Sequence, residues 1–169
     1  GVRFNQTDTN GVGLADNITD FPSTQLSYEI TFASDGILGS QQIFASYAVT
    51  GSSNEFLVYD NGGNLRVILN DGSGLDIPVD MSPFYDGAPQ TMAVTWDSAS
   101  GDLRFFMNGA ELFNGTVASG VTLDQGGTFA LGQDQDALGG GFSPSQNFNG
   151  TIYGASLYGD IRTPSEILN

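Results

Sequence analysis

The chain has 169 residues, a length that suits one domain with a substantial hydrophobic core. Its 19 acidic residues face only four arginines, which leaves a formal net charge of −15 at pH 7. Such a charge repels nucleic acid and anionic lipid, and it fits either salty surroundings or the binding of divalent cations. Because the sequence contains no His, Cys or Lys, catalytic triads, thiol nucleophiles, Schiff bases and disulfides are excluded.

Carboxylates are the only catalytic groups left, and hydrolysis by paired carboxylates needs two acids about 5–9 Å apart across a cleft. The four glutamates are widely scattered, at Glu29, Glu55, Glu111 and Glu166, and no strand of the E-x-D-x-E type is present. We therefore predict that the protein is not an enzyme. The sequence also lacks an apolar run of 18 residues, a signal peptide and an initiating Met, so we expect a module of a larger exported protein.

The apolar residues follow a two-residue rhythm in many short segments that are separated by turn residues. Leu26 to Phe32 alternates clearly, and Asp60 to Gly63, Asn70 to Gly74 and Asn108-Gly109 are typical of turns. Short first strands are predicted within residues 1–21, and further strands over 26–32, 42–48, 55–59, 65–69, 90–96, 103–107, 112–113, 128–131 and 151–158. This pattern predicts an all-β fold, an antiparallel sandwich of two sheets in a single domain spanning residues 1–169.

One helical turn is expected at the C-terminus. Thr163-Pro164-Ser165-Glu166 has the pattern of a capping box, with proline at the first helical position. Trp96, the only tryptophan, lies in an apolar strand and is expected in the core.

Two carboxylates stand close together in the segment 131–151. Asp134 and Asp136 flank Gln135, and no basic residue occurs between Phe105 and Ile161 to separate their charges. Calcium takes six to eight oxygens from carboxylates, amides and backbone carbonyls, all of which this segment offers. The alternative is a solvated acidic loop in an acidic protein, because a D-x-D pair is common.

The segment LGQDQDALGGGFSPSQNFNGTI resembles the calcium loop of the pentraxins and of the related laminin-G-like (concanavalin A-like) modules. Those families carry L-G-Q-[ED]-Q-D, then G-G-x-F, S-Q and G-x-I, which correspond here to residues 131–136, 139–142, 145–146 and 150–152. Residues 95–101, 46–48 and 54–55 are also similar, and the resemblance covers about residues 26–167. It implies a concanavalin A-like jelly roll.

The resemblance also implies a set of calcium ligands. Asp134, Asp136 and the side chain of Asn54 would hold one ion together with the backbone carbonyl of Gln135. Gln146 would serve a second ion. Because Ser143 stands where the family has an acid, whether a second ion binds is left open.

The ligand-binding residues implied by the resemblance surround the same ion. They are Ser53, Tyr59, Asp134, Asp136 and Gln146, with the turn at residues 70–73 as a further wall. Ser53 stands where the family usually has an acid. Tyr59 would stack on the apolar face of a sugar, and the alternative is that it only packs within its strand.

The pentraxins usually carry one internal disulfide, and the aligned positions here are Glu29 and Ala93. This departure fits an extracellular module of a large bacterial surface adhesin, held together by its core and its metal. We expect a monomeric, calcium-dependent lectin module that binds vicinal-diol sugars such as fucose or galactose on cell-surface glycans. The alternative is a structural or protein-interaction module in which calcium only makes the loop rigid.

Overall fold

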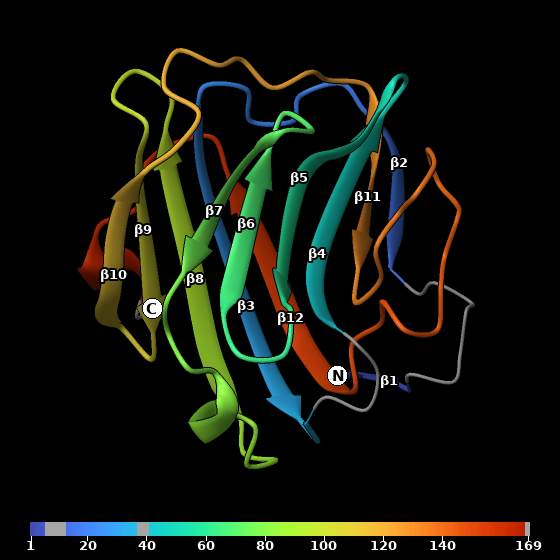
Figure 1. Cartoon of the computed structure of the whole chain (residues 1–169), viewed down its shortest axis with the longest axis vertical. Coiled ribbons are helices and arrows are strands. Elements are labelled where there is room, and N and C mark those ends of the chain that lie inside the picture. The colour runs from blue at the N-terminus through green and yellow to red at the C-terminus, as the bar shows by residue number, and fades with distance from the viewer. Residues whose placement is uncertain (6–12, 37–40, 168–169) are drawn as a thin grey trace.

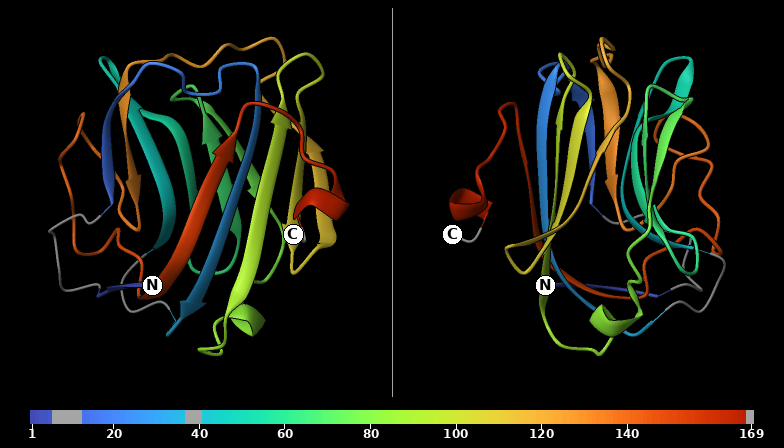
Figure 2. Two further views of the ribbon diagram at one scale, coloured as in Figure 1. Left: turned by 180° about the vertical axis from the view of Figure 1, so that it is seen from behind. Right: turned by 60° about the vertical axis from the view of Figure 1, so that its left-hand side comes forward.

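The computed structural model describes residues 1–5, 13–36 and 41–167, which form two six-stranded antiparallel sheets. The first sheet has the order β1 (Val2–Phe4), β12 (Gly150–Tyr158), β3 (Gln25–Ser34), β8 (Gln90–Asp97), β9 (Asp102–Met107) and β10 (Ala110–Thr116). The second has the order β2 (Leu14–Ile18), β11 (Gly127–Leu131), β4 (Gln42–Val49), β5 (Ser52–Asp60), β6 (Leu65–Leu69) and β7 (Ser73–Ile77). The two sheets face each other as the layers of a sandwich (Figure 1; Figure 2, right), which confirms the predicted fold class.

The core between the sheets is rich in aromatic rings. Phe32, Phe44 and Phe148 pack against one another with ring centroids 5.1–5.8 Å apart, and Phe4 meets Phe148 edge to face. Trp96 is fully buried, as the sequence predicts, and its indole NH donates to the carbonyl of Val117. Burying each such side chain stabilises the fold by about 1.5–3 kcal/mol.

Two short elements were missed by the sequence prediction. Strand β7 follows a turn in which Asn70 and Asp71 both adopt a positive φ, near 52° and 51°. A 3₁₀ turn, η1 (Ser82–Phe84), lies in the connection from β7 to β8. Neither segment has a long enough apolar pattern to stand out locally.

The predicted C-terminal turn is present as α1 (Pro164–Ile167). Glu166 accepts hydrogen bonds from the backbone NH and the hydroxyl of Thr163, at 2.8 and 2.7 Å, which is the capping box expected from the sequence. Ile167 packs on Ala93 and Phe106, so α1 covers part of the outer face of the first sheet (Figure 2). The described residues contain no helix with the length and apolarity of a membrane span.

Glu29 and Ala93, the positions that the resemblance aligned with a disulfide, are direct cross-strand partners on β3 and β8. The alignment with the pentraxins was therefore in register across these two strands. Here the pair holds a half-buried carboxylate beside a methyl group in place of two sulfurs.

Candidate calcium and ligand site

The acidic loop, residues 132–149, connects β11 to β12 and lies at the edge of the sandwich beside β11 and β2 (Figure 1). Phe148 anchors its C-terminal end, because the ring is buried among core phenylalanines and its backbone NH donates to the carbonyl of Gly132 at 2.7 Å. The two ends of the loop are thus fixed to each other and to the core. The residues between them are held against the second sheet.

Gln135 pins the middle of the acidic loop. Its fully buried side-chain amide donates to the carbonyls of Thr128 and Ser46 at 2.9 and 3.1 Å, and its Oε1 accepts from the backbone NH of Gly139 at 3.0 Å. The side chain is therefore occupied with fixing the loop. Only the backbone carbonyl remains for a ligand role, which is the role that the resemblance implies.

Asp134 is a buried carboxylate with no cationic partner among the described residues. It is 5% exposed, its Oδ2 accepts from Gln146 Nε2 at 2.9 Å, and its Oδ1 lies 3.5 Å from the hydroxyl of Ser46. All ion pairs found among the described residues involve other carboxylates. Burial, and secondly the charge of Asp136, raise the pKa of Asp134 to about 6. The ionised form therefore lacks the compensation that a nearby cation would supply.

A second group of predicted residues lies at the start of β5. Asn54 donates to Asp71 Oδ1 at 3.4 Å and to Ser53 Oγ at 3.3 Å, while the backbone NH of Asp71 donates to the carbonyl of Asn54 at 2.9 Å. Asp71 belongs to the turn that the sequence suggested as a wall of the ligand site. Both the backbone NH and the side-chain carboxylate of Asp71 are hydrogen-bonded to Asn54, so the turn is fixed against the start of β5.

A hollow of about 460 Å³ at the tip of the β4–β5 hairpin takes lining residues from the acidic loop and from the second group, but Asn54, Asp134 and Gln146 do not line it. It is lined by Val49, Thr50, Gly51, Ser52, Ser53, Asp71, Asp136, Ala137 and Leu138. Asp136 is exposed and lines this hollow, whereas Asp134 is buried. Five of the lining residues come from positions or segments that the sequence analysis singled out: Ser53, Asp71 in the turn at residues 70–73, and Asp136, Ala137 and Leu138 in the segment 131–151.

The ligand atoms available at this loop are of the chemical type that calcium prefers. They are the carboxylates of Asp134 and Asp136, the amides of Asn54 and Gln146, and the backbone carbonyl of Gln135, which are all oxygen ligands. In the described ranges no three side chains among Asp, Glu, His and Cys gather closely enough to hold an ion alone. An ion at this loop must therefore use amide and backbone oxygens as well, which calcium accepts. Gln146 would have to turn its amide so that Oε1 replaces Nε2.

Tyr59 is not a lining residue of the hollow; it lies on β5 directly opposite Arg66 of β6. It is half-buried, and burial is the main cause that raises the pKa of its phenol, with Asp76 and Asp134 adding to the rise and Arg66 opposing it. Tyr59 thus shares an electrostatic environment with the acidic loop. The ion pair between Arg66 and Asp76, at 2.7 Å, was missed in the sequence because the two residues are ten positions apart.

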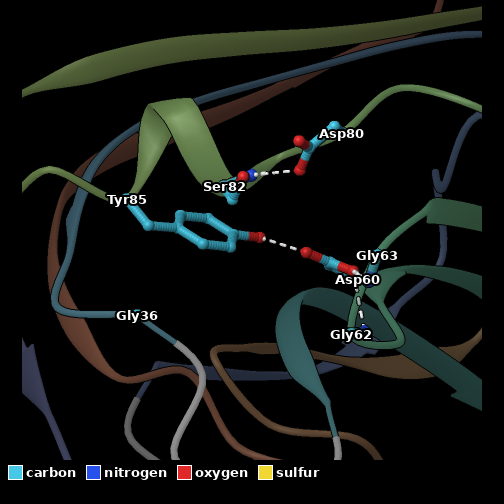
Figure 3. Close-up of a pocket in the computed structure, with 7 residues that line it drawn as sticks. All are labelled: Gly36, Asp60, Gly62, Gly63, Asp80, Ser82 and Tyr85. Carbon is cyan, nitrogen blue, oxygen red and sulfur yellow. Dashed lines mark hydrogen bonds between the residues drawn. The ribbon is translucent and has the colours of Figure 1, made fainter.

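Another pocket, of about 400 Å³, lies at the opposite end of the sandwich, between the β5–β6 hairpin and η1 (Figures 1 and 3). Its central group is the buried carboxylate of Asp60, which accepts from the backbone NH groups of Gly62 and Gly63 at 2.9 and 3.0 Å and from the hydroxyl of Tyr85 at 2.8 Å. These bonds fix the predicted Asp60 to Gly63 turn against the 3₁₀ turn. The buried carboxylate of Asp60 therefore has a structural role, which is to hold the turn at residues 60–63 in place.

The profile of the Pentaxin family matches residues 6–169. The chain belongs to the pentraxin family. It is 29% identical over 116 residues to the serum amyloid P-component of Bos taurus, a match that covers 68% of this chain and 50% of the bovine one. The chain therefore spans about half the length of that relative. Pentraxin domains are non-enzymatic binding modules, which confirms for this domain the prediction that it is not an enzyme.

Solved structures show the same fold. The heptameric SAP-like pentraxin of Limulus polyphemus superposes with a TM-score of 0.81 at 20% identity, covering 98% of this chain and 78% of its own. Domains LG4-5 of the mouse laminin alpha1 chain superpose with a TM-score of 0.67 at 13% identity, covering 96% and 43%. At these identities the likeness concerns the fold, and it confirms the resemblance to both groups.

Proposed function

We propose that this pentraxin domain is a calcium-dependent carbohydrate-binding module that acts outside the cell. The observation that carries the proposal is Asp134, a buried carboxylate beside Asp136 that lacks a cationic partner among the described residues. Leaving a buried charge uncompensated costs several kcal/mol, and a bound cation removes that cost. Membership of the pentraxin family supports calcium as the cation.

Five residues of the predicted set would hold the ion: Asn54, Asp134, Gln135, Asp136 and Gln146. We propose a single ion, because residues 137–149 contain no carboxylate that a second ion could claim for itself. Calcium supplies open coordination positions that two neighbouring hydroxyls of a sugar can fill. Asp136 and Asp71, exposed at the edge of the hollow, then accept hydrogen bonds from those hydroxyls.

Neutral sugars suit this surface better than anionic ones. The chain carries a net charge of −15, and the hollow itself is lined by Asp71 and Asp136. We therefore propose vicinal-diol sugars such as fucose, galactose or mannose as the terminal unit, with Tyr59 offering a ring for stacking. As one module of a larger surface protein, the domain would mediate adhesion to cell-surface glycans, with avidity adding to a modest single-site affinity.

A glycan array tests the proposal when it is probed in millimolar calcium and again in chelator. Wild-type protein should bind in calcium alone, and Asp134→Asn should lose that binding while keeping its β-rich circular dichroism spectrum. Asp160→Asn, an exposed acid elsewhere, serves as the matched control and should bind normally. If calcium raises the melting temperature but no glycan binds, the domain is a calcium-stabilised structural or protein-interaction module.

A further inference from the structure

The outer face of the first sheet carries a polar pocket of about 220 Å³. It lies on β12, β3 and β8, which run side by side on the face shown in Figure 2, left. Cross-strand pairing places Ser156 opposite Glu29 in one row, and Gly154 opposite Thr31, which faces Thr91, in the next row. Directly opposed residues project to the same side of a sheet, so these residues meet as walls of one pocket.

Glu29 brings an unpaired carboxylate to this pocket. The residue is half-buried, and its Oε1 is covered and has no hydrogen-bond partner among the described residues. The ion pairs found among those residues all involve other carboxylates. Burial is the main cause that raises the pKa of Glu29, which reflects the lost solvation of its ionised form. A cationic ligand would compensate that loss.

Arg162 acts on Glu29 through its charge but is held by other partners. Its charge lowers the pKa of Glu29, whereas the charge of Glu166 raises it. The guanidinium carbon of Arg162 lies 4.1 Å from the ring centroid of Tyr158, and its Nη1 lies 3.6 Å from Glu166 Oε1. The backbone NH of Arg162 donates to Ser27 Oγ at 2.9 Å, which fixes this segment on the sheet. The carboxylate of Glu29 is therefore left without an ion pair.

The other walls of the pocket supply hydroxyl groups and open space. The hydroxyls of Thr31 and Thr91 lie 3.3 Å apart, and each hydroxyl oxygen has two lone pairs, so acceptor positions remain for a ligand. Ser156 adds a third hydroxyl. A Cβ on Gly154 would meet nothing within 4 Å, so the bare backbone leaves room for a group of a ligand. The pocket thus suits a cation that brings several hydrogen-bond donors.

We propose that this pocket binds the guanidinium group of an arginine side chain on a partner protein. A guanidinium has five N–H donors in one plane and no acceptor, and it is more weakly hydrated than an ammonium, so it suits a half-buried site. The carboxylate of Glu29 would take its charge, and the hydroxyls of Thr31 and Ser156 would accept further N–H groups. The net charge of −15 attracts a basic partner. The acidic loop lies against the second sheet, so this interaction is independent of the proposed sugar binding.

Titration of isotope-labelled protein with two small probes, followed by NMR in chelator, tests the pocket. The probes are N-acetyl-arginine amide and its uncharged counterpart N-acetyl-citrulline amide, which has nearly the same shape. The arginine probe should bind wild-type protein about tenfold more tightly than the citrulline probe and should shift the amide signals of Thr31, Thr91 and Gly154. Glu29→Gln should bring the two affinities together. Gly154→Leu should prevent both probes from binding, because the new side chain fills the pocket.

Gly63→Leu is the matched control, since a Cβ on Gly63 also meets nothing within 4 Å and the residue lies in the β5–β6 turn of the other sheet. It should bind both probes as the wild type does. If Gly154→Leu does not fold, Glu29→Gln decides the question, because it keeps the shape of the side chain and removes only its charge. The proposal is overturned if the wild type does not prefer the arginine probe, or if the preference survives in Glu29→Gln, which would show attraction by the net charge alone.

Discussion

Gln146 and Asp134 are joined twice: the side-chain amide of Gln146 donates to Asp134 Oδ2 at 2.9 Å, and the backbone NH of Asp134 donates to the carbonyl of Gln146 at 3.2 Å. The residues are twelve positions apart, so the two bonds clamp the acidic loop across its width. They supply neutral donors to a carboxylate that has no cationic partner among the described residues. The two hydrogen bonds therefore hold the Asp134 carboxylate in place but do not neutralise its negative charge, which a bound cation would do.

Calcium should stabilise the folded domain. An ion that binds only the folded state adds RT ln(1 + [Ca]/Kd), about 2.7 kcal/mol at a hundredfold excess over Kd, and extracellular sites often have Kd values around 10⁻⁴–10⁻³ M. Magnesium should do less, because it demands a tight octahedron and loses water reluctantly. Melting curves in chelator, calcium and magnesium give the test, and three coincident curves would contradict a calcium site coupled to folding.

The effect of calcium should depend on pH through Asp134. Its folded pKa of about 6 lies above the ordinary value of 3.8, so the folded state holds this proton more tightly than the unfolded state does. In chelator the free energy of unfolding should consequently fall as pH rises from about 4 to about 6, by roughly 3 kcal/mol at most from this group. Calcium binds the ionised carboxylate and should reverse the loss.

Melting temperatures between pH 4 and pH 7 measure this contribution when wild type is compared with Asp134→Asn in chelator. The variant cannot titrate at residue 134, so its melting temperature should fall less than that of the wild type as the pH rises over that interval. Equal slopes for the two proteins would show that Asp134 does not carry the pH dependence.

Phe148→Ala should weaken both the fold and the calcium site. The ring is fully buried against Phe4, Phe32 and Phe44, and truncating such a residue costs about 3–5 kcal/mol. The acidic loop would also lose its anchor, so calcium affinity should fall. Chemical denaturation and calcium titration provide the measurements. Phe142→Ala, within the loop but only half-buried, is the control and should cost less stability.

A disulfide can be introduced between β3 and β8. Glu29 and Ala93 are directly opposed in an antiparallel pair, where Cα atoms lie about 4.5–5.5 Å apart, within the range of natural disulfides. Glu29→Cys combined with Ala93→Cys should therefore oxidise spontaneously and stabilise the domain by about 2–4 kcal/mol. The same protein in reductant is the control. Two thiols still titratable after oxidation would show that the register differs from the one observed.

The sequence by itself determined much of the local structure. The strand predictions covered all of the twelve strands in the described residues except β7, because an apolar or alternating pattern between turn residues is a property of each segment alone. The capping box at Thr163 and Glu166 formed as predicted, since its bonds span only three residues. The motif from Leu131 to Ile152 likewise identified the family, because its residue types and spacing are read directly from the chain.

The tertiary structure alone decided which of these segments meet. Alternation tells which residues share a face of a strand, but it does not tell which strand lies alongside, because pairing across a sheet depends on contacts distant in sequence. Asp71 therefore reached Asn54, and Arg66 reached Tyr59 and Asp76, only once β5, β6 and β7 were placed in register. The burial of Asp134 was decided in the same way: a D-x-D pair looks solvated in the sequence, and it was the packing of the anchored loop onto Ser46 that removed one carboxylate from water and left the other exposed.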